Sequence, residues 1–220
     1  MYIVFVFKSF AYDISRGIRV VFTGCFLFWH LLAIVLTYIL VVSGFDWWFF
    51  SVTRGDAVLF LGASAGLLGL FIPLIIPLLF YGFGVVRRTA RYNLLAVHSF
   101  QAVVISFFII AGYKALTGRI QPDFFDYGAV NDISRAFQFG FLRHGIFWGW
   151  PSSHAGVAFA LSTFLFLWFR NKRWIGVFAL FYASYIAFGA SVSFHWFSDV
   201  LAGVIVGSLV GYVVYAHLRT

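Results

Sequence analysis

From residue 21 onward, the chain alternates long apolar runs with short polar connections. Each run is close to the roughly 20 residues that an α-helix needs to cross the hydrocarbon core of a bilayer. The pattern therefore predicts an all-α membrane protein, a polytopic bundle of six transmembrane helices. The predicted spans are Val21–Phe45, Ala57–Val86, Leu94–Tyr113, Ser153–Phe169, Trp174–Ser191 and Trp196–Leu218.

Residues 1–20 follow a different pattern, in which a short apolar string from Tyr2 to Phe7 is followed by scattered charges. Too few apolar residues precede Lys8 for a removable signal peptide, and no small-residue cleavage site follows. We expect an interfacial helix lying on the bilayer, with its basic residues toward the headgroups. A disordered start is the alternative.

The composition agrees with a membrane protein. Of the 220 residues, 63% are hydrophobic and only 10% are charged, which is too apolar for a water-soluble domain. The net charge of +8 includes no basic run long enough to indicate nucleic-acid binding. No internal repeat appears, and the lone Cys25 cannot form an internal disulfide. We therefore expect one integral membrane domain over residues 1–220, whose largest polar region is an outer loop at 114–152.

The distribution of basic residues predicts the orientation in the membrane. With the N-terminus inside, ten basic residues lie on the inner side and five on the outer side, and six of the seven aspartates lie outside. The positive-inside rule then places both termini in the cytoplasm. The outer basic residues are Arg54, Lys114, Arg119, Arg135 and Arg143. This topology brings the loop at 114–152 and the connection before the sixth span to the same outer face.

His195 and Asp199 are four residues apart at the start of the sixth span. On a helix, positions i and i+4 share a face, so Asp199 can fix one ring nitrogen of His195 and leave the other free to attack or to bind a metal. Ionisable groups at the edge of a membrane span are costly and usually functional. The alternative is an interfacial histidine followed by an aspartate that stabilises the helix N-terminus.

The outer loop ends in Pro151-Ser152-Ser153-His154, which predicts the start of a helix. Ser152 can cap this helix, and its free N–H groups form a natural anion site. His154 would lie in the first turn, where it can donate a proton beside a bound anion. Lys114 and Arg119 would bring positive charge from the end of the third span.

In these motifs the chain resembles the type 2 phosphatidic acid phosphatase (PAP2) superfamily, which includes the vanadium haloperoxidases. That family has a Lys followed after six residues by Arg-Pro, then Pro-Ser-Gly-His, then Ser-Arg followed by His and Asp. Lys114 with Pro122, the segment 151–154, and His195 with Asp199 match these motifs in order. The likeness is strong from Lys114 to the C-terminus and implies a PAP2/haloperoxidase-like helical core.

The resemblance implies a two-step hydrolysis that needs no metal or other cofactor. His195 would attack phosphorus to give a phosphohistidine, with Asp199 orienting it, and His154 would protonate the leaving alkoxide. Lys114, Ser152 and Ser153 would hold the phosphate oxygens together with nearby N–H donors.

The chain departs from the family pattern at two positions. Gln121 stands where the first motif has Arg, and Gly189, after Phe188, stands where the third has Arg. A charge-assisted hydrogen bond contributes about 1.5–3 kcal/mol, so both losses together would weaken phosphate binding by several kcal/mol. We expect Arg119 to substitute in part, with Arg143 or Arg135 as auxiliary ligands. In the alternative, Arg135, Arg143 and His144 simply face water or lipid headgroups.

Together these features predict an inner-membrane phosphatase that acts on a lipid phosphate from the outer, periplasmic face. Candidate substrates are undecaprenyl pyrophosphate, phosphatidylglycerol phosphate, phosphatidic acid and lipid A phosphates. A catalytically silent relative that binds lipid headgroups is the second hypothesis, supported by Gln121 and Gly189. A lipid phosphotransferase is the third. The expected partners are the bilayer and the lipid substrate, with no nucleic acid, and the sequence does not indicate the oligomeric state.

Overall fold

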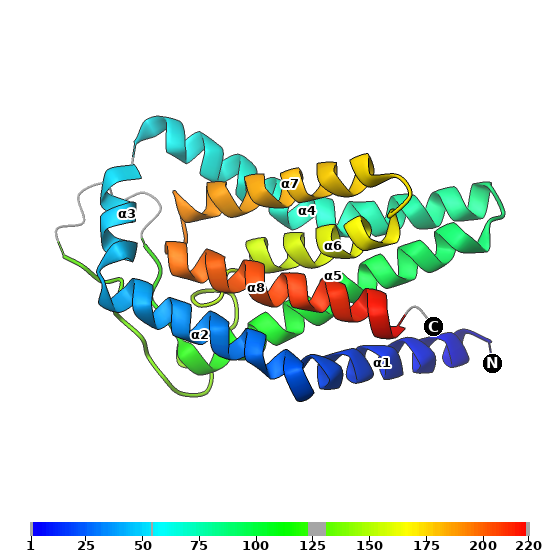
Figure 1. The fold of residues 1–220 in the computed structure, drawn as a ribbon, viewed down its shortest axis with the longest axis horizontal. Coiled ribbons are helices and arrows are strands. Elements are labelled where there is room, and N and C mark those ends of the chain that lie inside the picture. The colour runs from blue at the N-terminus through cyan, green and yellow to red at the C-terminus, as the bar shows by residue number, and fades with distance from the viewer. Residues whose placement is uncertain (1, 54, 123–130, 219–220) are drawn as a thin grey trace.

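The computed structural model describes the chain except residues 1, 54, 123–130 and 219–220. The described part is helical and contains one isolated β-bridge, between Arg119 and Phe137, but no strand (Figure 1). Its α-helices are α1 (Tyr2–Val21), α2 (Leu27–Val42), α3 (Phe45–Thr53), α4 (Asp56–Val86), α5 (Ala90–Thr117), α6 (Ser153–Trp168), α7 (Arg173–Ser191) and α8 (Phe197–Val213). A 3₁₀ turn precedes α2 (Gly24–Phe26), and a π turn follows α8 (Val214–Leu218).

Five of the described helices are long and apolar enough to cross a membrane: α2 with its preceding turn, α4, α5, α7, and α8 with the turn that follows it. α5, with 28 residues, is about 42 Å long, more than the roughly 30 Å of a hydrocarbon core. α6 is apolar but has only 16 residues. The predicted helical membrane bundle is confirmed, whereas the count of six spans stays a prediction.

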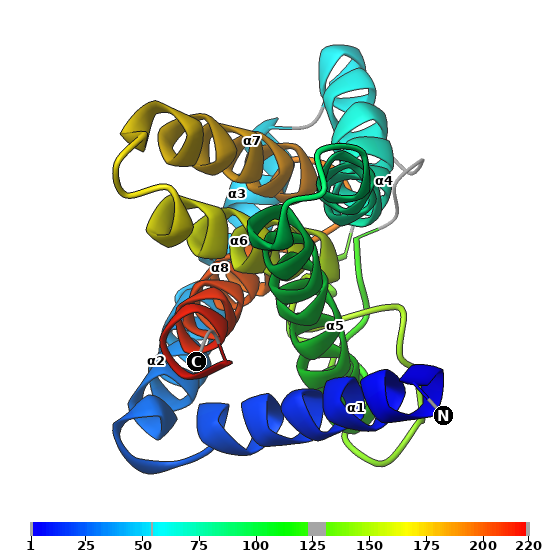
Figure 2. The same cartoon turned by 90° about the vertical axis from the view of Figure 1, so that its right-hand side faces the viewer.

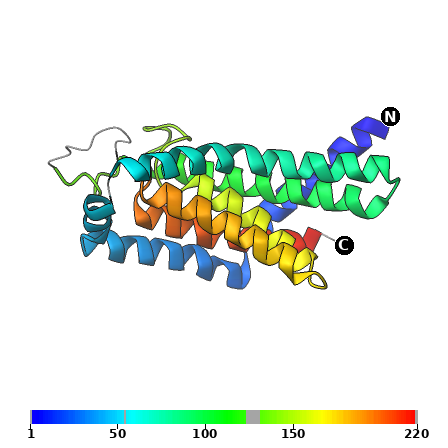
Figure 3. The same ribbon diagram turned by 90° about the horizontal axis from the view of Figure 1, so that it is seen from above.

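The helices pack as a bundle around α6, which contacts α4, α5, α7 and α8. Viewed along the bundle, α6 lies between α7, α8 and α5, with α4 beside α5 and α7 and with α2 against α8 (Figure 2). The view from above shows the same helices running side by side (Figure 3). α6 is therefore surrounded by four neighbouring helices.

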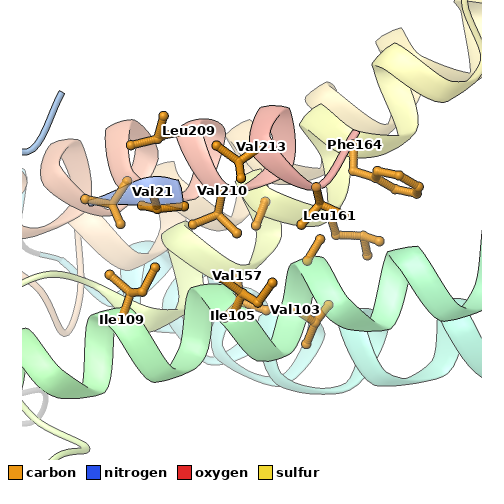
Figure 4. Packing of buried hydrophobic residues seen from close by; sticks show 14 of the residues in the cluster. Val21, Val103, Ile105, Ile109, Val157, Leu161, Phe164, Leu209, Val210 and Val213 are labelled. Carbon is orange, nitrogen blue, oxygen red and sulfur yellow. The ribbon is translucent and has the colours of Figure 1, made fainter. Parts of the chain in front are cut away.

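The main hydrophobic core lies between α5, α6 and α8 (Figure 4). Ile105 and Ile109 of α5 meet Val157 and Leu161 of α6, and Val210 of α8 completes the contact. These apolar side chains leave both water and lipid, and the dispersion contacts of close packing stabilise their arrangement.

Small residues bring α6 and α8 close together. Gly203, Gly207 and Gly211 recur every fourth residue along α8, so they form one face of that helix. A Cβ added at Gly207 would collide with the carbonyl of Gly156 in α6, and one at Gly203 would lie 2.6 Å from the carbonyl oxygen of Ser152. The two backbones are thus in direct contact, as at other small-residue membrane interfaces.

The first 53 residues differ in detail from the prediction. Residues 2–21 are helical, as expected for the N-terminal segment, and Val21 at the end of α1 is fully buried in the main core. The position of α1 on the bilayer surface stays a prediction. The first span ends at Val42, not Phe45, because Gly44 adopts a φ of +75°. The chain then turns into α3, a short helix that the hydrophobic pattern did not predict.

Candidate active site

The polar residues singled out in the sequence gather at one end of the bundle. The C-terminal end of α5, the start of α6 and the connection from α7 to α8 all lie at the end of the bundle opposite to the start of α1 and the end of α8 (Figure 1). α5, α6, α7 and α8 run antiparallel in succession, so this arrangement follows from the order of the helices. Lys114, His154, His195 and Asp199 are delivered from separate elements to one region.

His195 and Asp199 form the first part of the site. His195 lies in the connection just before α8, and its backbone N–H donates to the carbonyl of Ala190, which folds this connection into a tight turn. The Nδ1 atom of His195 lies 3.3 Å from Oδ2 of Asp199. Both side chains are buried, so the predicted pairing of imidazole and carboxylate is present.

Burial lowers the pKa of His195 to about 4, because the charged imidazolium loses its hydration. The hydrogen bond to Asp199 acts against this shift and raises the pKa, whereas the positive charges of Lys114 and Arg119 lower it further. His195 is therefore a neutral imidazole near pH 7, the form in which a ring nitrogen can act as a nucleophile.

His154 lies in the first turn of α6, across from His195. Ser152 caps the helix as predicted, since its Oγ accepts a hydrogen bond from the backbone N–H of Ala155 at 3.5 Å. The ring centroids of His154 and His195 are 6.4 Å apart, and Phe194 packs edge-on against His154. The buried Nδ1 of His154 has no hydrogen-bond partner among the described residues. The imidazole is thus held by packing.

Lys114 and Ser152 are buried beside the histidines. Nζ of Lys114 donates to the carbonyl of Phe147 at 2.9 Å, and this side chain is only 1% exposed. The backbone N–H of Ser152 donates to the carbonyl of Asp199 at 2.9 Å, which ties the start of α6 to the start of α8. Ser153 is half-buried at the first position of α6.

Gln121 lies directly on the ring of His195. Its Nε2 is 2.6 Å from Nδ1 and 3.1 Å from Nε2 of the imidazole, and its buried Oε1 has no described partner. When Nδ1–H donates to Asp199, the amide of Gln121 can donate only to Nε2. Gln121 therefore belongs to the site, where its amide lies against both ring nitrogens of His195.

Arg119 is fully buried behind the carboxylate. Nη1 donates to Asp199 at 2.5 Å and to Ser198 at 2.7 Å, and Nη2 donates to Asp46 at 2.7 Å. Nε and Nη2 also donate to the carbonyl of Ser134. The guanidinium is engaged with these groups, so in this structure Arg119 orients Asp199 and does not present a free cation to a phosphate.

Asp46 also belongs to this region, although the motifs in the sequence did not predict it. Asp46 lies in the first turn of α3, is fully buried, and accepts hydrogen bonds from Ser198 through both the backbone N–H at 2.9 Å and the hydroxyl at 2.5 Å. The only signal in the sequence was an aspartate inside an aromatic run after the first span. α3 thus connects the N-terminal part of the chain to the start of α8.

The predicted auxiliary ligands Arg135 and Arg143, and position 189, lie away from this cluster. Arg143 is exposed and its side chain lies against Gly140 of its own loop. Arg135 donates to the carbonyl of Val42 at 3.3 Å. Gly189 faces α4, where an added Cβ would collide with Ala65 and lie 2.9 Å from the carbonyl oxygen of Leu61. No group of three metal-ligating side chains occurs among the described residues.

The fold and the site define a class of protein: a membrane-embedded helical bundle with two neighbouring imidazoles at one end, of which the buried His195 is paired with a carboxylate. The family model described as the PAP2 superfamily matches residues 94–220, more than half of the chain. The protein belongs to the PAP2 superfamily, which confirms the resemblance seen in its motifs.

A lipid A 4'-phosphatase of Bacteroides thetaiotaomicron is similar to this chain, with 32% identity over 110 residues. The similarity covers 49% of this chain and 47% of that protein, so the chain spans about half the length of this curated relative. No solved structure matches the chain significantly. Family and relative together support a lipid phosphatase.

Proposed function

We propose that the protein hydrolyses a phosphate ester or anhydride of a membrane lipid through a phosphohistidine intermediate. The proximity of His154 and His195 carries this proposal, since two imidazoles with ring centroids 6.4 Å apart can flank one phosphoryl group. Asp199 adjoins Nδ1 of His195, so Nε2 is the attacking atom.

In the first step, Nε2 of His195 forms a bond to phosphorus while the bond from phosphorus to the leaving oxygen breaks. Protonated His154 donates its proton to that oxygen. The leaving group is the lipid alcohol when the substrate is a phosphomonoester and the lipid monophosphate when it is a pyrophosphate. In the second step, water attacks phosphorus, His154 accepts a proton from it, and the P–N bond breaks. Neutral His195 and protonated His154 are restored with inorganic phosphate as the product.

Fixed donors would stabilise the phosphoryl oxygens in both steps. Lys114 supplies the buried positive charge, and the N-terminus of α6, with Ser153 at its first position, supplies backbone N–H groups. Arg119 is a positioning residue, because it touches Asp199 and Ser198 and so acts on His195 through them. No resident metal or cofactor is part of this proposal.

The substrate is an amphiphile in this proposal. The site lies at one end of a bundle whose outer surface is rich in exposed apolar side chains, so a lipid can approach from the bilayer. The lipid A 4'-phosphatase favours a lipid A phosphate among the candidates, which also include undecaprenyl pyrophosphate, phosphatidylglycerol phosphate and phosphatidic acid. We place the site at the periplasmic face of the inner membrane, on the basis of the positive-inside rule.

Gln121 favours a second candidate function, a silent relative that binds lipid headgroups without turnover. Its amide lies 3.1 Å from Nε2 of His195, the position that a phosphorus atom would approach. For catalysis this side chain must turn aside. A lipid phosphotransferase, in which another lipid replaces water in the second step, would use the same groups.

Release of inorganic phosphate from the candidate lipids by the purified protein tests the proposal. We expect release by the wild type, none by His195→Ala, inhibition by vanadate and no effect of chelators. The control variant is His217→Ala, which alters a histidine at the opposite end of the bundle. Equal rates for wild type and His195→Ala would refute the nucleophile. Lipid binding without release, unchanged in His195→Ala, would support the silent relative.

A further inference from the structure

A polar cavity lies at the end of the bundle opposite to the candidate active site. It has a volume of about 470 Å³ and lies where α5 begins, α6 ends and α7 begins, beside the π turn after α8. Arg91 and Lys114 are 23 positions apart on α5, which separates the cavity from the candidate active site by about 34 Å. The cavity is therefore separate from the group of residues around His195.

The cavity has strong positive charge. Arg91, Arg170 and Lys172 line it, and none of them forms an ion pair with a carboxylate in the described part of the chain. α5 and α7 both begin here, and neither has an acidic residue in its first turn. The positive ends of two helix dipoles therefore add to the three side-chain charges. A single anion would meet several favourable charges at once.

The walls of the cavity are aromatic and apolar. Tyr92, Trp168 and Tyr215 line it together with Leu95 and Phe169. The guanidinium of Arg170 donates to the hydroxyl of Tyr215 at 3.5 Å, which holds one cation at the rim. Aromatic rings of this kind lie at the level of lipid headgroups in membrane proteins. Cationic rim and apolar wall match a molecule with a charged head and an apolar tail.

We propose that this cavity binds the phosphodiester headgroup of an anionic phospholipid such as phosphatidylglycerol. Arg91, Arg170 and Lys172 contact the phosphate, and the upper part of an acyl chain lies against the aromatic and apolar wall. Basic pockets between transmembrane helices are typical sites for anionic headgroups. The bound lipid bridges the starts of α5 and α7 with the end of α6, so it fastens helices that carry the candidate site at their other ends.

Native mass spectrometry of the full-length protein in detergent tests this site, with phosphatidylglycerol and phosphatidylcholine as probes. We expect wild type to bind phosphatidylglycerol at least tenfold more tightly than phosphatidylcholine. Each cation near an anionic headgroup strengthens binding about fivefold, so combined Arg91→Gln, Arg170→Gln and Lys172→Gln should weaken it about a hundredfold. All three residues are exposed, so their replacement leaves the core intact. The three single variants, each about fivefold weaker, provide the same test if the combined variant is unstable.

A matched control removes the same charge from the same end of the bundle. Arg87, Arg88 and Arg173 are exposed and do not line the cavity, and their combined replacement by Gln should reduce the affinity less than threefold. An equal loss in this control, or unchanged binding in the cavity variant, would overturn the site. Displacement of phosphatidylglycerol by inorganic phosphate would show that the cavity selects free phosphate and would overturn the lipid assignment. The readout is binding, so it stands apart from phosphate release.

Discussion

At the residue scale, the candidate site depends on a buried chain of charges. Asp46, Arg119 and Asp199 are all fully buried, and Arg119 is the only cation in contact with either carboxylate among the described residues. Two carboxylates without that guanidinium would face each other in a medium that solvates charge poorly. The position of His195 is thus coupled, through Asp199, to Arg119 and Asp46.

Replacing Arg119 by Gln should lower the free energy of unfolding by about 3–5 kcal/mol, because two buried carboxylates lose their counter-charge. The measurement is chemical unfolding of the purified protein in detergent. Arg143→Gln is the matched control, since Arg143 is exposed and its removal should change stability by less than about 0.5 kcal/mol. If Arg119→Gln were as stable as this control, the buried ion pairs would make no net contribution to the free energy of unfolding.

The pH dependence should reveal the lowered pKa of His195. With a pKa of about 4, the imidazole is neutral over most of the working range, so kcat/KM should fall on acidification only near pH 4 and not near 6.5. In Asp199→Asn, loss of the carboxylate removes an effect that raises the pKa, so the acidic limb should move to still lower pH. A limb that stays near pH 6.5 in both proteins would contradict the burial of His195.

The same shift affects stability. The unfolded chain binds a proton at His195 below about pH 6.5, whereas the folded chain does so only below about pH 4. The free energy of unfolding should therefore decrease as the pH falls through this window, by up to about 3 kcal/mol, and level off below it. His195→Phe, which cannot titrate, should lack this contribution, as unfolding curves at several pH values will show.

Placing Arg at the two positions where the family motifs have it should have different effects. Position 121 adjoins His195, so Gln121→Arg places a cation beside the bound phosphoryl group and should tighten vanadate binding about 10- to 100-fold. Position 189 faces α4, so Gly189→Arg must displace that helix and should reduce stability by about 1–3 kcal/mol or more. Isothermal titration and unfolding measurements distinguish the two. A gain in vanadate affinity at 189 would place that side chain in the site after all.

The sequence allowed prediction of the main residues of the candidate site but not of all their hydrogen-bond partners. Lys114, His154, His195 and Asp199 occur in recognisable spacings, and helix order brings their segments to one end. The engagement of Arg119 with Asp46 could not be predicted, because it joins positions 73 residues apart through a turn whose direction depends on Gly44. Gln121 as a contact of His195 likewise required the path of the loop.

At the element scale, α6 is placed by its contact with α8. A Cβ at Gly207 would collide with the carbonyl of Gly156, so Gly207→Ala should push the helices apart and reduce stability by about 1–3 kcal/mol. Because α6 carries His154, phosphate release should fall as well. Gly112→Ala is the control, since a Cβ there meets no atom within 4 Å. Wild-type stability and turnover in Gly207→Ala would mean that the α6–α8 contact is loose.

Hydropathy predicts the long apolar helices of this chain whether lipid or protein surrounds them. α4 and α5 read clearly as spans because each is an apolar run longer than a bilayer core. α6 was predicted as Ser153–Phe169 and ends one residue earlier, at Trp168; with 16 residues it is shorter than the other predicted spans. α3 was not predicted because its aromatic residues continue the apolar run of α2. The two helices are separated only at Gly44, which has a left-handed backbone conformation.

At the scale of the whole molecule, the candidate site and the basic cavity lie at opposite ends of one bundle, so a single orientation decides which side of the membrane each one faces. Fewer basic residues lie at the site end than at the other end, and the cytoplasmic leaflet attracts the richer end. The site should therefore face the periplasm, where its lipid substrate would be reached from the outer leaflet.

Cysteine labelling in spheroplasts of expressing bacteria checks this orientation. After Cys25→Ser, the exposed Ser51 of α3 and the exposed Asn171 between α6 and α7 are replaced singly by Cys. A membrane-impermeant maleimide should label the Ser51→Cys protein in intact spheroplasts and the Asn171→Cys protein only after lysis. The reverse pattern would show that the site faces the cytoplasm. In that case the lipid substrate would lie in the inner leaflet.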